Sequence, residues 1–122
     1  MQNDRAPKTT VRVLHTHRAP LSRPVTVSAG DRIELGPLSE EWPAFVRVTT
    51  ATGEFGWVPI RNIEHVDGTQ GRVVADYNTT ELNAEAGELL TVLLADTEVG
   101  WLWCRNADRH AGWIPCNRVT EP

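Results

Sequence analysis

Residues 53–64 of this chain of 122 residues read GEFGWVPIRNIE, and residues 110–121 read HAGWIPCNRVTE. Both stretches contain Gly, Trp, an aliphatic residue and Pro in that order, followed by another aliphatic residue and a Glu. Gly56 and Gly112 lie 56 residues apart, which is roughly half of the chain. A repeat at this spacing predicts two structural units of the same kind.

The residues around the repeat form short apolar stretches bounded by turn residues, such as VRVL, RVVADY, ELLTVLLA and WLWCRN. They are rich in Val, Ile, Leu, Thr and Trp, and none continues at a 3.6-residue period for long enough to indicate a helix. TTATGEF and NADRHAG have the composition of hairpin turns. The sequence therefore predicts an all-β fold.

Side chains alternate between the two faces of a strand, so the repeated tetrapeptide also predicts orientations. Val58 and Ile114 are expected to point into a core, and Trp57 and Trp113 to face outward. One face of the strand would then pack, and the other would be available for recognition.

Two breaks divide the predicted strands. Residues 1–8 have no periodic pattern and are expected to form a flexible tail. Asp67, Gly68 and Gly71 interrupt the apolar pattern near the middle of the chain. We therefore predict one domain over residues 9–66 and a second over residues 71–121, joined by a short link.

The net charge of −4 is distributed unevenly, with +1 on residues 1–66 and −5 on residues 67–122. Nucleic-acid binding usually needs a basic face, so no nucleic-acid partner is expected. No apolar run is long enough to cross a membrane. The N-terminal stretch MQNDRAPKTT lacks the hydrophobic segment of a secretory signal, which predicts a cytoplasmic protein.

The chain has no catalytic motif of a recognised kind, and we expect it not to be an enzyme. Cys104 and Cys116 have no companion cluster at zinc spacing and are interpreted as small buried residues. His15 and His17 lie two residues apart, but two ligands do not make a metal site. No metal and no cofactor are therefore expected.

Several motifs in the second half occur in the order typical of one known family. VVADY occupies residues 73–77, ELNAEAGE occupies residues 81–88, and GWLWCRN is followed by AGWIPCNRV. This order resembles the SH3 domain, a small five-stranded β-barrel with an ALYDY motif, a turn with Gly and an acid, a Trp pair and a Gly-aromatic-aliphatic-Pro-x-Asn-Tyr-Val motif. VLHTH of residues 13–17 is similar to ALYDY in position. The resemblance, which extends to bacterial SH3 domain-containing proteins, implies two tandem small SH3-like β-barrels of about five strands each.

SH3 domains bind Pro-rich peptides in an extended left-handed conformation through aromatic grooves and an acidic loop. In the second unit the resemblance implies ligand binding through Tyr77, Glu81, Trp101, Trp103, Trp113 and Pro115. Ala75 and Arg118 stand where the family has groove tyrosines, so a Pro-rich ligand is not required. The alternative role of these aromatic residues is packing in a core or an interface.

The first unit departs further from the family pattern. It retains Trp42, Trp57 and Pro59 as candidate binding residues. Arg18 and Arg23 occupy the loop in which SH3 domains have acids, so a groove for an acidic peptide is one interpretation. A role as a spacer or docking platform is the other.

Three functions agree with these observations. The first is a non-enzymatic tandem SH3-like module that binds a peptide or protein through an aromatic surface of the second unit. The second is a structural subunit whose aromatic faces mediate packing between domains or in a homo-oligomer. The third is binding to peptidoglycan in the cell wall, as in bacterial SH3-like domains, which the expected cytoplasmic location disfavours.

Overall fold

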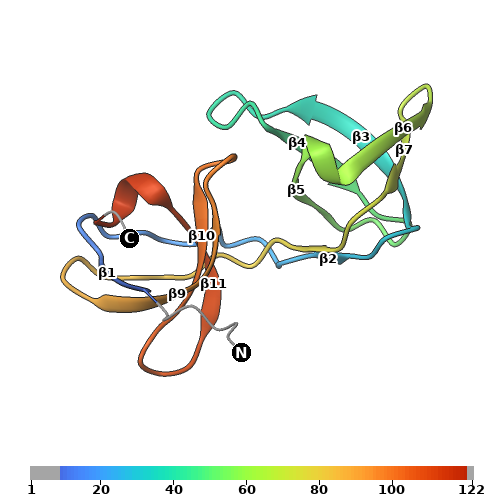
Figure 1. The fold of residues 1–122 in the computed structure, drawn as a ribbon. Helices are drawn as coiled ribbons and strands as arrows, with labels where there is room; N and C mark the ends of the chain where they lie inside the picture. Colours follow the sequence, from blue (N-terminus) through green and yellow to red (C-terminus); the bar gives the residue numbers. More distant parts are fainter. Residues whose placement is uncertain (1–8, 121–122) are drawn as a thin grey trace, which may run out of the picture. The chain divides into compact units, whose positions relative to one another are not determined.

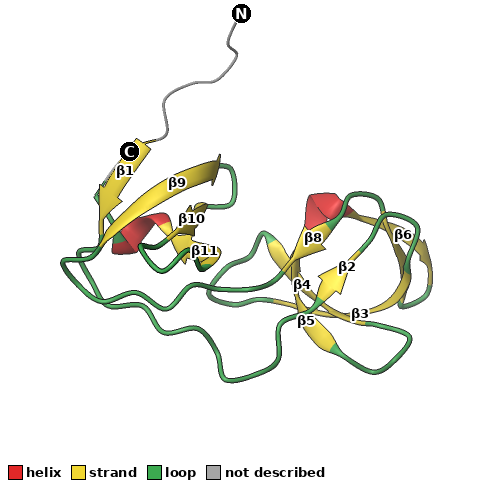
Figure 2. Cartoon of the chain, turned by 90° about the horizontal axis from the view of Figure 1, so that it is seen from below, coloured by secondary structure: helices red, strands yellow, loops and turns green. Residues whose placement is uncertain are grey.

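The computed structural model describes residues 9–120. Its strands, which Figure 1 labels except for β8, labelled in Figure 2, are β1 Thr9–Arg12, β2 Thr26–Val27, β3 Arg32–Leu38, β4 Phe45–Thr49, β5 Phe55–Pro59, β6 Ile63–Asp67, β7 Gln70–Val73, β8 Tyr77–Asn78, β9 Leu89–Asp96, β10 Trp101–Arg105 and β11 Ala111–Pro115. Over this described range, the helical segments are two 3₁₀ turns, η1 Ile60–Asn62 and η2 Cys116–Arg118 (Figure 2). The all-β prediction is confirmed, and the tail predicted for residues 1–8 lies outside the described residues.

The strands form two compact units, one built from a single segment of the chain and the other from two separate segments. The inserted unit contains residues 22–79, and the discontinuous unit combines residues 9–21 with residues 80–120. The chain therefore passes from one unit to the other twice, as its colours show in Figure 1. This division differs from the predicted domains, which met between residues 66 and 71.

The inserted unit contains a five-stranded sheet with the strand order β5-β4-β3-β7-β6, and a two-stranded ladder of β2 and β8. Alternate residues of the strands bury one side of the sheet. The buried core consists of Val25, Val27, Ile33, Val46, Val48, Val58 and Val73. β7, which was predicted to open the second domain, lies between β3 and β6 and is an interior strand of this unit.

The discontinuous unit contains a four-stranded sheet with the order β1-β9-β10-β11. β1 is antiparallel to β9, and isolated bridges join Val13 to Val119 and His17 to Ala84. The buried core consists of Val11, Val13, Leu82, Ala84, Leu90, Val92, Leu102, Cys104, Ile114 and Val119. Residues from both ends of the described chain therefore close one core.

Each unit takes its first strand from the half of the chain that was assigned to the other unit. We call residues 9–18 and 70–79 the first arms. Val13 donates a hydrogen bond to Glu88 O at 2.8 Å and accepts one from Gly87 N at 2.7 Å. Val73 makes the same two bonds, at 2.8 and 2.7 Å, with the residues at the corresponding turn of the inserted unit. VLHTH and VVADY are equivalent, as expected, but the arms are exchanged, because a strand's own pattern does not specify the sheet that it joins.

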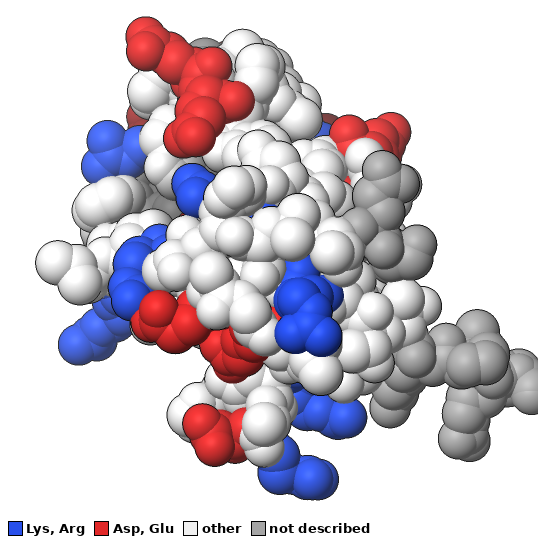
Figure 3. Space-filling model, turned by 90° about the vertical axis from the view of Figure 1, so that its left-hand side faces the viewer, with Lys and Arg blue, Asp and Glu red and all other residues white. Residues whose placement is uncertain are grey.

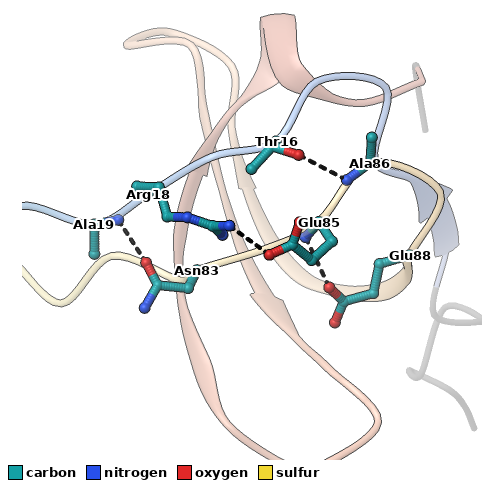
Figure 4. A network of polar contacts seen from close by, with 7 residues as sticks. All are labelled: Thr16, Arg18, Ala19, Asn83, Glu85, Ala86 and Glu88. Atoms are coloured by element: carbon teal, nitrogen blue, oxygen red, sulfur yellow. Dashed lines mark hydrogen bonds and ion pairs between the residues drawn. The ribbon is translucent and has the colours of Figure 1, made fainter.

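Side chains and backbone groups fix the first arm of the discontinuous unit, as Figure 4 shows. Ala19 N–H donates to Asn83 Oδ1 at 2.7 Å, and Ala86 N–H donates to Thr16 Oγ1 at 3.1 Å. Arg18 forms an ion pair with Glu85 nearby. Both charged side chains are exposed, so the pair adds little stability, and the backbone bonds determine the register.

Both copies of the repeated tetrapeptide form the same element. β5 ends at Pro59 and continues into η1, and β11 ends at Pro115 and continues into η2. Pro has no backbone N–H, so it suits the end of a ladder. The repeat therefore marks one strand and one 3₁₀ turn in each unit.

Candidate peptide-binding surface

The side of β4 and β5 that faces away from the core of the inserted unit is the most aromatic part of that unit. Val46, Val48 and Val58 point into the core. Because side chains alternate along a strand, the intervening residues share the opposite side. We call this side the β4–β5 outer face; it consists of Arg47, Thr49, Phe55 and Trp57, together with Phe45 and Pro59, which are buried.

Two aromatic side chains of the β4–β5 outer face are accessible to solvent. Trp57 is 42% exposed and Phe55 is 45% exposed. The guanidinium carbon of Arg47 lies 4.1 Å from the centroid of the Phe55 ring, a cation–π contact that orders both side chains. Arg47 also lies opposite Trp57 in the ladder. The face therefore combines apolar area with a fixed positive charge, which is typical of recognition surfaces.

Two further predicted site residues lie in the same unit. Tyr77 is half-buried on β8, opposite Val27, and packs against the core of the inserted unit. Trp42 is half-buried in the loop between β3 and β4, where its backbone N–H donates to Ser39 Oγ at 3.0 Å. Both therefore belong to the inserted unit, and each side chain is partly exposed.

Phe45 was not predicted as a site residue. It is 5% exposed and lies opposite Pro59, as Trp101 lies opposite Pro115 in the other unit. Trp42 was one of the candidate binding residues of the first half, but the register gives the position equivalent to Trp101 to Phe45. The spacing in the sequence indicates this equivalence, because Phe45 and Trp101 each precede the Gly of the repeat by 11 residues.

In the discontinuous unit the equivalent aromatic residues are mostly buried. Trp101 is 8% exposed and Trp113 is 7% exposed, and Pro115 is also buried. Trp103 is half-buried and packs edge-on against Trp113, with ring centroids 5.2 Å apart and planes at 72°. Alternation correctly excluded Trp113 from the core cluster, but the expectation that it would be accessible is wrong.

A buried histidine occupies the second aromatic position of VLHTH. The Nε2 atom of His17 lies 2.9 Å from Glu81 Oε1, and its ring meets Trp101 edge-on with centroids 6.0 Å apart. Glu81 was expected to bind a basic ligand residue, but its carboxylate instead accepts a hydrogen bond from His17. The backbone of Glu81 also forms a parallel bridge with Trp113, so this residue is part of the packing of the unit.

Polar side chains from the two 3₁₀ turns bind the first arms. Arg118 Nη1 donates to Thr16 O at 3.3 Å, and Asn62 Nδ2 donates to Ala75 O at 3.3 Å. Asn62 is 8% exposed. Arg118 stands where SH3 domains have a groove tyrosine, so this position stabilises the first arm and does not supply an aromatic wall.

The predicted site residues fall into two groups. Tyr77, Trp42, Trp57 and Pro59 belong to the inserted unit, and Glu81, Trp101, Trp103, Trp113 and Pro115 belong to the discontinuous unit. The surface expected from Tyr77, Trp101 and Trp113 together is not formed within one unit. The reason is the exchange of first arms, which gives Tyr77 to the inserted unit.

The cysteines are free thiols. Burial raises the pKa of Cys104 to about 12, with a smaller contribution from Cys116. Burial also raises the pKa of Cys116. Both thiols are therefore protonated near neutral pH. Within residues 9–120, no group of three His, Cys, Asp or Glu side chains is placed to hold a metal ion.

The face drawn in Figure 3 has acidic and basic side chains interspersed among neutral ones. A continuous basic surface, which nucleic-acid binders use to neutralise phosphates, does not cover that face. Among the described residues, no helix has the length and apolarity needed to span a membrane.

Comparison with known proteins gives a family match for one region of the chain. Residues 71–121 match the family model described as Variant SH3 domain. The matched region begins within β7, so its first arm belongs to the inserted unit and its remaining strands to the discontinuous unit. No curated protein and no solved structure matches the chain.

Proposed function

We propose that this protein is a non-enzymatic protein-interaction module that binds an extended peptide segment on the β4–β5 outer face of the inserted unit. The exposure of Trp57 and Phe55 supports this proposal most directly. The SH3 match of residues 71–121 supports an interaction module in general, because the domains of this family bind peptides.

The proposed binding surface lies in a different unit from the one expected from sequence. Trp113, the repeat equivalent of Trp57, is 7% exposed and packs on Trp103. A ligand would gain little contact with it. Trp57 offers a large apolar ring beside the ordered cation of Arg47, an arrangement suited to a peptide with apolar and acidic residues.

Peptides selected by phage display against the full chain provide a defined probe. Trp57→Ala is expected to weaken the selected peptides on the order of tenfold or more, because a central Trp commonly dominates the free energy of an interface. Leu94→Ala is the matched control, since Leu94 is 57% exposed and lies in the other unit. Isothermal titration calorimetry measures both effects.

Chemical shifts of the indole N–H groups test the location independently. Titration of the ¹⁵N-labelled chain with a selected peptide is expected to shift the Trp57 signal most strongly. Shifts confined to Trp101, Trp103 and Trp113 would contradict the proposal and favour the discontinuous unit. Unchanged affinity of Trp57→Ala would do the same.

Assembly through the same face is the second candidate function, because exposed aromatic area also suits contact between copies of the chain. Sedimentation velocity distinguishes the two. A dimer that Trp57→Ala converts to a monomer would assign the β4–β5 outer face to self-association.

A further inference from the structure

The two first arms have equivalent backbone positions. β1 pairs with β9 in the discontinuous unit as β7 pairs with β3 in the inserted unit. The corresponding pairs are Val11–Leu90 and Thr10–Thr91 in one unit, and Gly71–Ile33 and Gln70–Glu34 in the other. Backbone hydrogen bonding therefore does not decide which first arm completes which unit.

Side-chain volume distinguishes the two positions. Val11 is 1% exposed and contributes to the core of the discontinuous unit. Gly71 has the equivalent position in the inserted unit, and a Cβ there would lie 3.0 Å from Ile33 Cδ1 and 3.1 Å from Ile63 Cγ2. Both distances are shorter than ordinary van der Waals contact, so a valine side chain would fit only if the side chains of Ile33 and Ile63 moved.

The side chains around the two positions differ in size, and the larger ones surround the glycine. Ile63 and Leu35 surround Gly71, and Val119 and Val92 occupy the corresponding places in the discontinuous unit. The correspondence follows from the ladders, because each neighbour has the same position relative to its first arm. Larger neighbours thus accompany the glycine, and smaller neighbours accompany the valine.

We infer that Val11 and Gly71 select the exchanged pairing of first arms and units. In the alternative pairing, the arm with Val11 would enter the inserted unit and overlap Ile33 and Ile63. The arm with Gly71 would enter the discontinuous unit and leave an empty volume in its core. Close-packed interiors disfavour both overlap and cavities, so the alternative is disfavoured in both units at once.

The selection also determines which ring side chains each unit receives from its first arm. The arm that contains Val11 brings His17 to Trp101 in the discontinuous unit. The arm that contains Gly71 brings Tyr77 to the core of the inserted unit. Val11 and Gly71 are therefore positioning residues, which determine the place of His17 and Tyr77 through the arms that carry them.

Paired cysteines in the full chain report which arm occupies which unit. Thr10→Cys with Thr91→Cys joins residues that face each other in the exchanged arrangement, at a separation that a disulfide spans. Gln70→Cys with Thr91→Cys joins the residues that would face each other in the alternative. Both variants carry Cys116→Ser, and Cys104 remains because it is fully buried.

We expect the first pair to oxidise within one chain with a yield on the order of tenfold or more above that of the second, since overpacking in one unit and a cavity in the other together disfavour the alternative by at least that factor. The double substitution V11G with G71V exchanges the two side chains and should reverse which cysteine pair oxidises in higher yield. Equal yields in the parent chain, or an unreversed preference after the exchange, would overturn the inference. Disulfide-linked dimers on a non-reducing gel would also overturn it, because a second copy would then supply the arm.

A milder series keeps the test decisive if the exchanged variant does not fold. Glu34→Cys with Gln70→Cys reports the arm of the inserted unit. Adding Gly71→Ala places a methyl group against Ile63 and should lower this yield severalfold. Ile33→Val should restore the yield, because it removes the Cδ1 atom that lies nearest to the added methyl group, at 3.0 Å. Failure of this rescue would show that side-chain volume does not select the arm.

Discussion

Gly112 on β11 is the position at which one added methyl group should destabilise the protein most. A Cβ there would lie 2.8 Å from the carbonyl carbon of Glu81 and 2.8 Å from the backbone nitrogen of Leu82. Backbone atoms cannot rotate away as the end of a side chain can. In Gly112→Ala, residues 80–82 must therefore move away from β11.

The magnitude follows from the contacts that this movement breaks. Trp113 N–H donates to Thr80 O at 2.9 Å, and Leu82 N–H donates to Trp113 O at 2.9 Å. The loss of two backbone hydrogen bonds costs about 2 kcal/mol. Partial exposure of Leu82 adds about 1 kcal/mol, and the lower entropy of unfolded Ala offsets about 0.5 kcal/mol. Gly112→Ala should thus lower the free energy of unfolding by about 2.5 kcal/mol.

Gly56→Ala is the matched control, because Gly56 is the same residue of the other repeat. Its Cβ would lie 3.2 Å from the Cγ2 atom of Thr79 and 3.7 Å from the next nearest atoms, all of them in side chains. A cost below about 1 kcal/mol is expected. Urea unfolding followed by circular dichroism measures both variants. If Gly112→Ala were as stable as Gly56→Ala, the close approach of residues 80–82 to β11 would be refuted.

Three further predictions test other features. Burial raises the pKa of Cys104 from its ordinary value of 9 to about 12, so the stability that the protonated thiol contributes is complete below pH 9 and is lost as the pH rises toward 12. Between pH 9 and 12, the free energy of unfolding should fall by about 1.4 kcal/mol per pH unit more steeply in the parent chain than in Cys104→Ala. Equal slopes in the two proteins would contradict the burial of this thiol. Asn62→Ala should destabilise by about 1–3 kcal/mol, because the Ala75 carbonyl loses its donor, whereas exposed Asn117→Ala should change stability by less than about 0.5 kcal/mol in thermal unfolding. Cleavage at a protease site introduced into the β6–β7 turn should give two fragments that elute together in native gel filtration, because each fragment supplies a first arm to the other fragment's unit. Fragments that separate without denaturant would argue against the exchange of first arms.

Local features of the fold were predictable from the sequence. The alternation of apolar residues and the turn composition indicated strands, and the spacing of Gly56 and Gly112 indicated two equivalent elements, each ending at Pro in a 3₁₀ turn. These features depend on backbone geometry and on neighbours within a few residues. Residues close in sequence were therefore sufficient to predict them.

The candidate site was predictable only in part. Alternation placed Trp57 and Trp113 outside the cores, but it does not determine solvent exposure. Trp113 is covered, with Trp103 edge-on against it, whereas Trp57 lies beside Arg47 and remains accessible. Exposure depends on side chains brought near by the fold, which the local pattern does not specify.

The sequence by itself determined the β class, the paired motifs and the equivalence of the segments that begin the two units. Only the tertiary structure decided that residues 9–18 complete the unit of residues 80–120, and that residues 70–79 complete the unit of residues 22–67. Both segments offer the same backbone hydrogen bonds, so their local patterns do not distinguish the two pairings. The difference lies in the space around Val11 and Gly71, which exists only when distant strands pack together.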